Sequence, residues 1–234
     1  MTIDYESIKR SVRVLLDENE DMQPLLDGSE GMDNDAMQTD QITEEMILQA
    51  VDRVHNMAPA EMLTDVTEEA AVTWSQFELA QRCTLPQDML RLTYVKLDGW
   101  LKGVSDFVPE GTALYSTMFS RFMAVRPTVA HPMVGVAHGV GNGLEIVAAP
   151  VVRTAGETAG TGAEGPTADA AGTVTGTVRY VKMAHHGGKI ADRCNMAMQW
   201  MVANLYYSIT GNSDMATMAA REVAEELGIS PKTE

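Results

Sequence analysis

The sequence is short of cysteine and has no long apolar run. Its 234 residues include only two cysteines, Cys83 and Cys194, which argues against a disulfide framework and favours free thiols in a reducing compartment. No apolar stretch approaches the roughly 18 residues that span a bilayer, and residues 1–20 lack the apolar core of a secretory signal. We therefore expect no membrane association. At 45% hydrophobic residues, the chain can bury a core in one large domain or two small ones.

The sequence also lacks an excess of basic residues. Its formal net charge is −16, and residues 1–78 hold 19 acidic and 4 basic side chains, whereas residues 79–234 hold 14 and 13. Proteins that read nucleic-acid sequence usually present a basic face, so this composition argues against such a reader. The acidic first third of the chain, residues 1–78, has two interpretations. It is either a solvated segment or a surface past which DNA slides without adhering.

No catalytic or cofactor-binding signature is present. The glycines of GVGNG (139–143) lack the GxGxxG spacing, and the sequence has neither a GxxxxGK[ST] phosphate loop nor a GxSxG nucleophile elbow. We therefore assign no catalytic and no cofactor-binding residues.

One stretch gathers side chains that often bind metals or catalyse: MAHHGGKIADRC (183–194), with His185, His186 and Cys194. Neighbouring side chains in a strand point to opposite faces, so the two histidines are poorly placed to share one metal. Cys194 falls on the apolar face of an expected helix, and a zinc site needs three or four ligands in tetrahedral reach. We interpret the stretch as the lead into a helix, with Gly187-Gly188 as a hinge, and predict no metal site.

Hydrophobic spacing predicts helices towards both ends of the chain. Apolar residues recur at helical spacing in 4–17, 43–58, 189–210 and 215–228. Thr43 is expected to cap the second of these helices, and Ser213 or Asp214 the last. A further short helix is predicted at 67–83, although Val72, Thr73 and Trp74 would also suit a strand.

Strands are predicted between the two helical ends. Period-two alternation appears in the stretch that starts at Leu85, at Leu90, Leu92 and Tyr94. Residues 126–152 are rich in valine around a Gly-Asn-Gly turn, and 174–183 is a final strand. Residues 107–122 suit a loop and a short helix. The acidic stretch 17–40 and the Gly/Ala/Thr stretch 154–176 are predicted loops.

These elements predict an α+β fold, in which the N- and C-terminal helices pack together as a helical bundle beside a central antiparallel β part with long loops. We expect three regions. The first, 1–84, holds the N-terminal helices and the acidic connector. The second, 85–186, is rich in β structure and carries a flexible loop at 154–176. The third, 187–234, holds C-terminal helices that pack back on the N-terminal ones.

Three stretches carry a resemblance. The first is IKRSVRVLLDEN, followed by the acidic connector and EEMILQAVDRVHNMAP; the second is LPQDMLRLTYVKLDGW with PEGTALYSTMFSRFMAVRPTVAHPMV; the third is VRYVKM with IADRCNMAMQWMVANLYYSITG. Together they span nearly the whole chain apart from 154–176. This layout resembles the head-to-tail ring (adaptor or connector) proteins of tailed bacteriophages, of the short-tailed or crAss-like type.

The resemblance implies a structural role without catalysis. Such proteins form a ring, typically of twelve copies, beneath the portal protein at one capsid vertex. The ring conducts genomic DNA without sequence-specific binding and offers a platform to the next tail ring or tail-tube protein. It implies a virion location at the head–tail interface, after synthesis in the host cytoplasm. Aromatic residues and methionine are enriched in interfaces, so we name Trp100, Tyr115, Met201 and Tyr206 as candidate interface residues; each can equally lie inside one subunit.

Two alternatives stay open. One is another phage structural component, a capsid auxiliary or tail-tube protein. The other is a small enzyme or metal-binding protein built on His185, His186 and Cys194.

Overall fold

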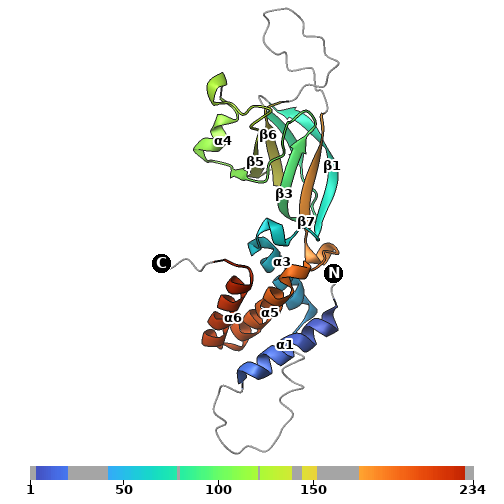
Figure 1. Cartoon of the computed structure of the whole chain (residues 1–234), viewed down its shortest axis with the longest axis vertical. Coiled ribbons are helices and arrows are strands. Elements are labelled where there is room, and N and C mark those ends of the chain that lie inside the picture. The colour runs from blue at the N-terminus through green and yellow to red at the C-terminus, as the bar shows by residue number, and fades with distance from the viewer. Residues whose placement is uncertain are drawn as a thin grey trace, which may run out of the picture. The chain divides into compact units, whose positions relative to one another are not determined.

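The computed structural model describes residues 4–20, 42–77, 80–120, 122–138, 144–151 and 174–229. Within these ranges the chain is mixed α and β, with five α-helices and one seven-stranded, curled sheet. It divides into two compact units (Figure 1): unit 1 comprises Met1–Thr67 and Val181–Glu234, and unit 2 comprises Glu68–Tyr180. Unit 1 is thus built from two separate stretches of sequence, and unit 2 lies between them along the chain.

Two helices of unit 1 precede unit 2 in the sequence, α1 (Tyr5–Glu20) and α3 (Glu44–Met57). The residues that α1 buries lie four apart, on one face: Ile8, Val12 and Leu16. α3 begins as predicted at Thr43, whose side-chain oxygen accepts a hydrogen bond from the Met46 amide at 3.2 Å. The helices expected at 4–17 and 43–58 are confirmed.

The other two helices of unit 1 follow unit 2. α5 (Asn195–Thr210) starts later than predicted, after a short 3-10 turn, and ends as predicted at Gly211, which has a left-handed φ of 81°. α6 (Ser213–Glu226) is capped by Asn212, whose Oδ1 accepts a hydrogen bond from the Met215 amide at 3.3 Å. The prediction of Ser213 or Asp214 as cap is therefore wrong by one or two residues, because the loop after Gly211 is shorter than expected. α5 contacts α1 and α3 and packs along α6.

Unit 2 holds the sheet. Its strands are β1 (Thr67–Phe77), β2 (Ala80–Thr84), β3 (Met89–Leu97), β4 (Phe107–Pro109), β5 (Met133–His138), β6 (Leu144–Ala149) and β7 (Val174–Lys182). They lie in the order β3-β7-β1-β2-β6-β5-β4. The pairs β1–β2, β2–β6 and β5–β6 are antiparallel, whereas β4 pairs parallel with β5. The expectation of an antiparallel β part is thus wrong for the pair β4–β5, which is parallel.

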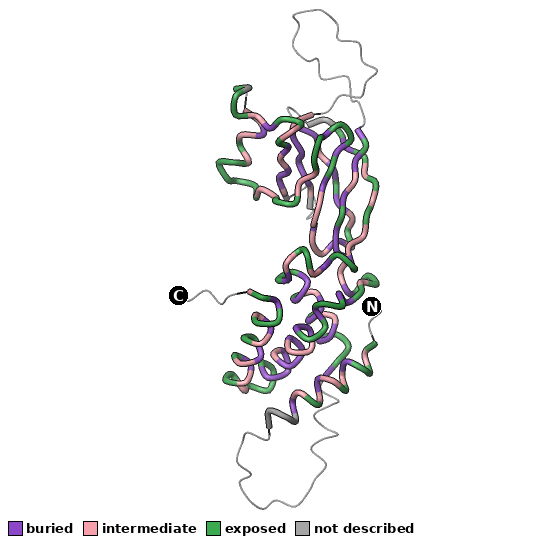
Figure 2. Tube along the Cα trace, in the orientation of Figure 1, coloured by how far each residue is buried: buried purple, intermediate pink, exposed green. Residues whose placement is uncertain are grey.

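The sheet is curled, so its two edges approach each other. β3 and β4 stand at opposite ends of the strand order, yet Val95 of β3 forms an antiparallel bridge with Val104, three residues before β4 begins. Since three residues span about 10 Å at most, β4 begins close to β3. The main core of unit 2 contains two tryptophans, Trp74 and Trp100. Figure 2 shows buried stretches along the strands of unit 2 and along α3 and α5 of unit 1.

The predicted helix at 67–83 is wrong. These residues form β1 and most of β2, paired antiparallel with Ser75 opposite Arg82. Glutamate and alanine in this stretch favour a helix locally, but pairing within the sheet and the complete burial of Trp74 outweigh that preference. The expected boundary after residue 84 consequently falls inside unit 2, between β2 and β3, and the structure divides the chain after residues 67 and 180.

Other predictions have mixed outcomes. The strands expected after Leu85, within 126–152 and at 174–183 are confirmed, as is the short helix within 107–122, which is α4 (Ala113–Thr117). Most of the connector 17–40, the Gly-Asn-Gly turn and most of the 154–176 loop lie outside the described residues, although α1 extends to residue 20 and β7 begins at 174. No helix within the described ranges is both long and apolar enough to span a bilayer.

Candidate functional site

The segment 183–194, which we call the histidine segment, links β7 to α5 in unit 1. Ala184–His186 forms a 3-10 turn, and Gly187 follows with a φ of 82°, a left-handed conformation that glycine adopts without strain. The Gly188 amide then donates to the Met183 carbonyl at 3.2 Å. Gly187-Gly188 therefore forms a turn between β7 and α5, at the position of the predicted hinge.

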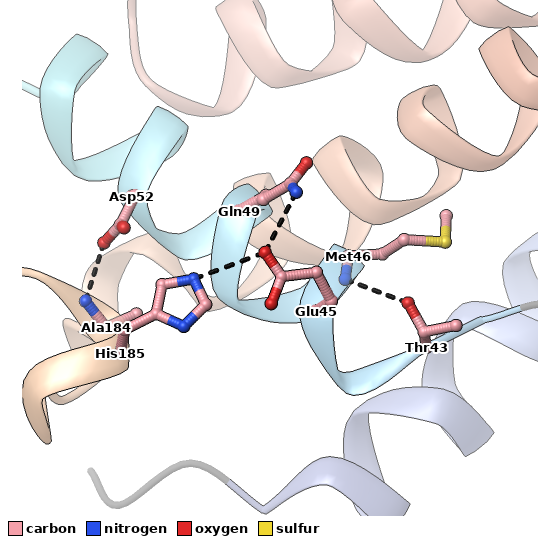
Figure 3. A network of polar contacts seen from close by, with 7 residues as sticks. All are labelled: Thr43, Glu45, Met46, Gln49, Asp52, Ala184 and His185. Atoms are coloured by element: carbon pink, nitrogen blue, oxygen red, sulfur yellow. Dashed lines mark hydrogen bonds and ion pairs between the residues drawn. The ribbon is translucent and has the colours of Figure 1, made fainter.

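Side chains of α3 hold the start of the histidine segment (Figure 3). Asp52 Oδ1 accepts a hydrogen bond from the Ala184 amide at 2.8 Å. Glu45 Oε1 lies 3.4 Å from His185 Nε2, an ion pair when the imidazole is protonated, and accepts a hydrogen bond from Gln49 Nε2 at 3.1 Å. Burial raises the pKa of Asp52, and the hydrogen bond from Ala184 opposes that rise. His185 thus belongs to a polar network that fixes the backbone of the segment.

The end of the histidine segment is held in the same way. His55 of α3 is 1% exposed, and its Nε2 accepts a hydrogen bond from the Ala191 amide at 3.3 Å. Burial lowers the pKa of His55 to about 4, while Asp65 opposes the shift. At neutral pH the imidazole is therefore neutral, as an acceptor must be. Asp65 Oδ2 accepts a hydrogen bond from the amide of the following residue, Asp192, at 2.9 Å.

The structure does not gather the candidate metal ligands. His185 and His186 are exposed, whereas Cys194 is buried immediately before α5. Burial raises the pKa of Cys194 to about 11, as it does for Cys83 in unit 2, so neither thiol is a thiolate at neutral pH. Among the described residues, no group of three or more His, Cys, Asp or Glu side chains is placed to hold a metal ion. The polar contacts of the histidine segment are those of a structural connection.

The four candidate interface residues fall into two groups. Trp100, Met201 and Tyr206 are 4–6% exposed, so they lie inside one chain, the second of the two placements considered above. Trp100 also donates from Nε1 to the Pro150 carbonyl at 3.3 Å. Tyr115, in α4, is half-buried with its ring over Gly135 of β5, so close that a Cβ there would lie 2.4 Å from a ring carbon. Burial within the single chain leaves little of Trp100, Met201 and Tyr206 for a partner, whereas Tyr115 is partly accessible.

Sequence reasoning missed a different set of residues. Within the described ranges nine large hydrophobic side chains are exposed, and five of them fall between residues 101 and 129 of unit 2. These five define what we call the 101–129 surface: Leu101, Leu114, Phe122, Val125 and Val129. Their exposed fractions run from 43% to 78%. α4, which carries Leu114, stands beside β5 (Figure 1).

A charge pattern also marks this region, and the sequence already contained it. Residues 111–144 include no acidic side chain and two arginines, in a chain whose net charge is −16. Two acidic residues, Asp106 and Glu110, lie between Leu101 and Leu114, so the acid-free part begins after them. Several large exposed apolar residues in one region are typical of surfaces that another protein covers. The 101–129 surface is therefore the candidate functional site of the described residues.

Comparison with known proteins adds no relative. No protein-family model matches the sequence, and no curated protein shows significant similarity to it.

Proposed function

We propose that this protein is a structural component of a tailed-phage virion that assembles into a ring of about twelve copies between the portal and the tail. The ring passes genomic DNA through its channel without reading its sequence. It binds the portal protein on one side and the next tail ring or tail-tube protein on the other. The protein works by contact and performs no catalysis.

The observation that carries this proposal is the exposed apolar surface on a chain of strongly acidic composition. Phe122 is 78% exposed and Leu101 is 74% exposed, and such side chains gain free energy when a partner covers them. A ring needs contacts of this kind between unlike faces of neighbouring copies, related by a rotation that closes. Exposed apolar residues also occur on unit 1, at Val14 of α1 and Ile209 of α5, which offers a second face.

The acidic balance supports a role in DNA passage. DNA carries a dense negative charge, so a channel built from a chain of net charge −16 repels the backbone and does not retain the genome. We include in the proposal a helical bundle formed by α1, α3, α5 and α6, since α5 contacts helices from the first part of the chain. This bundle supplies a rigid body for ring contacts.

The test is to determine the oligomeric form of the purified chain and its position in intact particles. Analytical ultracentrifugation is expected to give a species of about twelve 25.4-kDa chains, alone or after addition of portal protein. Electron cryomicroscopy of the particle is expected to show the ring directly beneath the portal. Density for this chain on the capsid shell or along the tail tube would instead support the alternatives of a capsid auxiliary or tail-tube protein. Turnover of a small molecule that is lost on changing one polar side chain would contradict the proposal.

A further inference from the structure

His55 of α3 is buried although an imidazole ordinarily takes up a proton just below neutral pH. Among the residues that the structure describes, it is the only histidine, acid or base that is buried. Its Nε2 accepts the hydrogen bond from the Ala191 amide, and this contact lies in the interior. An imidazole accepts such a bond only through the lone pair of an unprotonated nitrogen. A proton on Nε2 would therefore break the bond and leave a charge away from water.

The hydrogen bond to His55 holds the stretch of chain that leads into α5. Ala191 stands four residues before Asn195, where α5 begins, and its carbonyl accepts a hydrogen bond from the Cys194 amide at 2.9 Å. Ile190, Ala191 and Cys194 are at most 4% exposed, so they belong to the interior of unit 1. Loss of the contact at Ala191 therefore frees buried residues at the N-terminal end of α5.

Two neighbouring contacts of this stretch are exposed to solvent. The Asp192 amide donates to Asp65 Oδ2, and Arg193 Nη1 donates to the Glu61 carbonyl at 3.4 Å. Because water can replace the partner in an exposed hydrogen bond, such bonds contribute little net free energy. The buried bond to His55 is accordingly the one whose loss matters most.

The charged groups around His55 do little to favour its protonated form. Asp65 is the charge that acts on the imidazole, and it favours protonation. Asp192 and Arg193 of the histidine segment are exposed, Asp52 of α3 already accepts a backbone hydrogen bond, and α5 contains no charged side chain. Burial outweighs Asp65 and lowers the pKa of His55 to about 4. In mildly acidic solution the ring therefore binds a proton only when it reaches water.

We propose that His55 acts as an acid-operated latch: when its imidazole takes up a proton, residues 190–194 leave α3 and the N-terminal end of α5 opens, while unit 2 stays folded. The latch gives unit 1 a second conformation, which mild acid populates and neutral pH closes again. It concerns unit 1 of a single chain and does not depend on the proposed ring. Its direct consequence is that Cys194, buried in the closed form, becomes accessible.

Thiol labelling of the full-length protein tests the latch, because each unit has one buried cysteine. Cys194 is 0% exposed in unit 1, and Cys83 is 5% exposed in unit 2. The reagent 4,4′-dithiodipyridine, which modifies thiols in acidic as well as neutral solution, is added at pH 7.5 and pH 5 without denaturant. Mass spectrometry of the peptides gives the rate at each cysteine. Dividing each rate by that of the urea-unfolded chain at the same pH removes the effect of pH on the chemistry itself.

We expect the corrected rate at Cys194 to rise about thirty-fold between pH 7.5 and pH 5. This is the ratio that proton linkage gives for a group whose pKa is 6.5 in water and about 4 when buried. Cys83 is expected to react more slowly than Cys194 at pH 5, because only unit 1 opens. Equal corrected rates at the two cysteines would show that the whole chain unfolds, and a constant rate at Cys194 would show that the contact stays closed. Either result overturns the inference.

Two matched variants assign the effect to His55. His55→Gln keeps an oxygen that can accept the Ala191 hydrogen bond but binds no proton, and His186→Gln makes the same change at an exposed imidazole of the histidine segment. We expect His55→Gln to label at Cys194 with nearly the same corrected rate at both pH values, and His186→Gln to keep the thirty-fold rise. A rise that survives His55→Gln, or that His186→Gln abolishes, overturns the inference. If His55→Gln does not fold, the comparison of the two cysteines in the wild type still decides.

Discussion

The burial of His55 predicts that unit 1 loses stability as the pH falls below neutrality. In the unfolded chain this imidazole has an ordinary pKa of about 6.5, whereas burial lowers its pKa to about 4 in the folded chain. Between these two values the unfolded chain binds a proton that the folded chain does not. The free energy of unfolding therefore falls as the pH drops from about 6.5 to 4, and His55 contributes no further loss below that range.

The magnitude follows from the two pKa values. The full difference corresponds to about 3 kcal/mol, and about 2 kcal/mol of it should already be lost at pH 5 by proton linkage. Protonation also turns the acceptor Nε2 into a donor, so the 3.3 Å hydrogen bond from the Ala191 amide cannot persist. A charged imidazole on α3 thus destabilises the junction between α3 and the histidine segment.

The assay compares the wild type with His55→Gln by urea unfolding, followed by circular dichroism at 222 nm, at pH 7.5 and pH 5. Glutamine keeps an oxygen that can accept the Ala191 hydrogen bond but has no proton to bind. Because both proteins share every other titrating group, the difference between them isolates His55. We expect the wild type to lose about 2 kcal/mol more than the variant; parallel losses in the two proteins would refute the reasoning.

Three further predictions concern the same unit and the buried thiols. Gly188→Ala is expected to lower the melting temperature more than Gly187→Ala does. The new Cβ at position 188 would lie 2.8 Å from a backbone carbonyl, whereas at position 187 φ is positive but the Cβ would meet nothing within 4 Å. Equal losses would contradict the close packing around Gly188. Asp52→Ala leaves the amide that begins the histidine segment without its acceptor and is expected to cost about 1–3 kcal/mol in urea unfolding, whereas Asp52→Asn keeps an acceptor oxygen and should cost clearly less. Cys83 and Cys194 are buried, with pKa values raised to about 11, so Ellman's reagent is expected to react with neither until urea unfolds the chain; rapid labelling of the native protein would argue against this.

The elements that the sequence predicted well are those with a strong local pattern. Thr43 has acidic residues after it and apolar residues at helical spacing, and the helix it caps is present as predicted. Gly211 likewise ends α5. In both cases a few neighbouring residues determine where the helix begins or ends, through a capping hydrogen bond or a left-handed φ.

The failures concern structure that depends on distant residues. Residues 67–83 have a composition that suits a helix, but β1 pairs with β2 and lies beside β7, about a hundred residues away in sequence. Three of the four candidate interface residues, Trp100, Met201 and Tyr206, are buried for a similar reason: residue type alone does not distinguish Trp100, which is 4% exposed, from Phe122, which is 78% exposed.

The division of unit 1 between two stretches of sequence has a consequence for synthesis. Translation releases α1 and α3 first, then every strand of unit 2, and only afterwards α5, which contacts both early helices. The sheet can therefore mature on the ribosome while the apolar faces of α1 and α3 still await their partner, and during that interval these faces are exposed to chaperones and to other nascent chains.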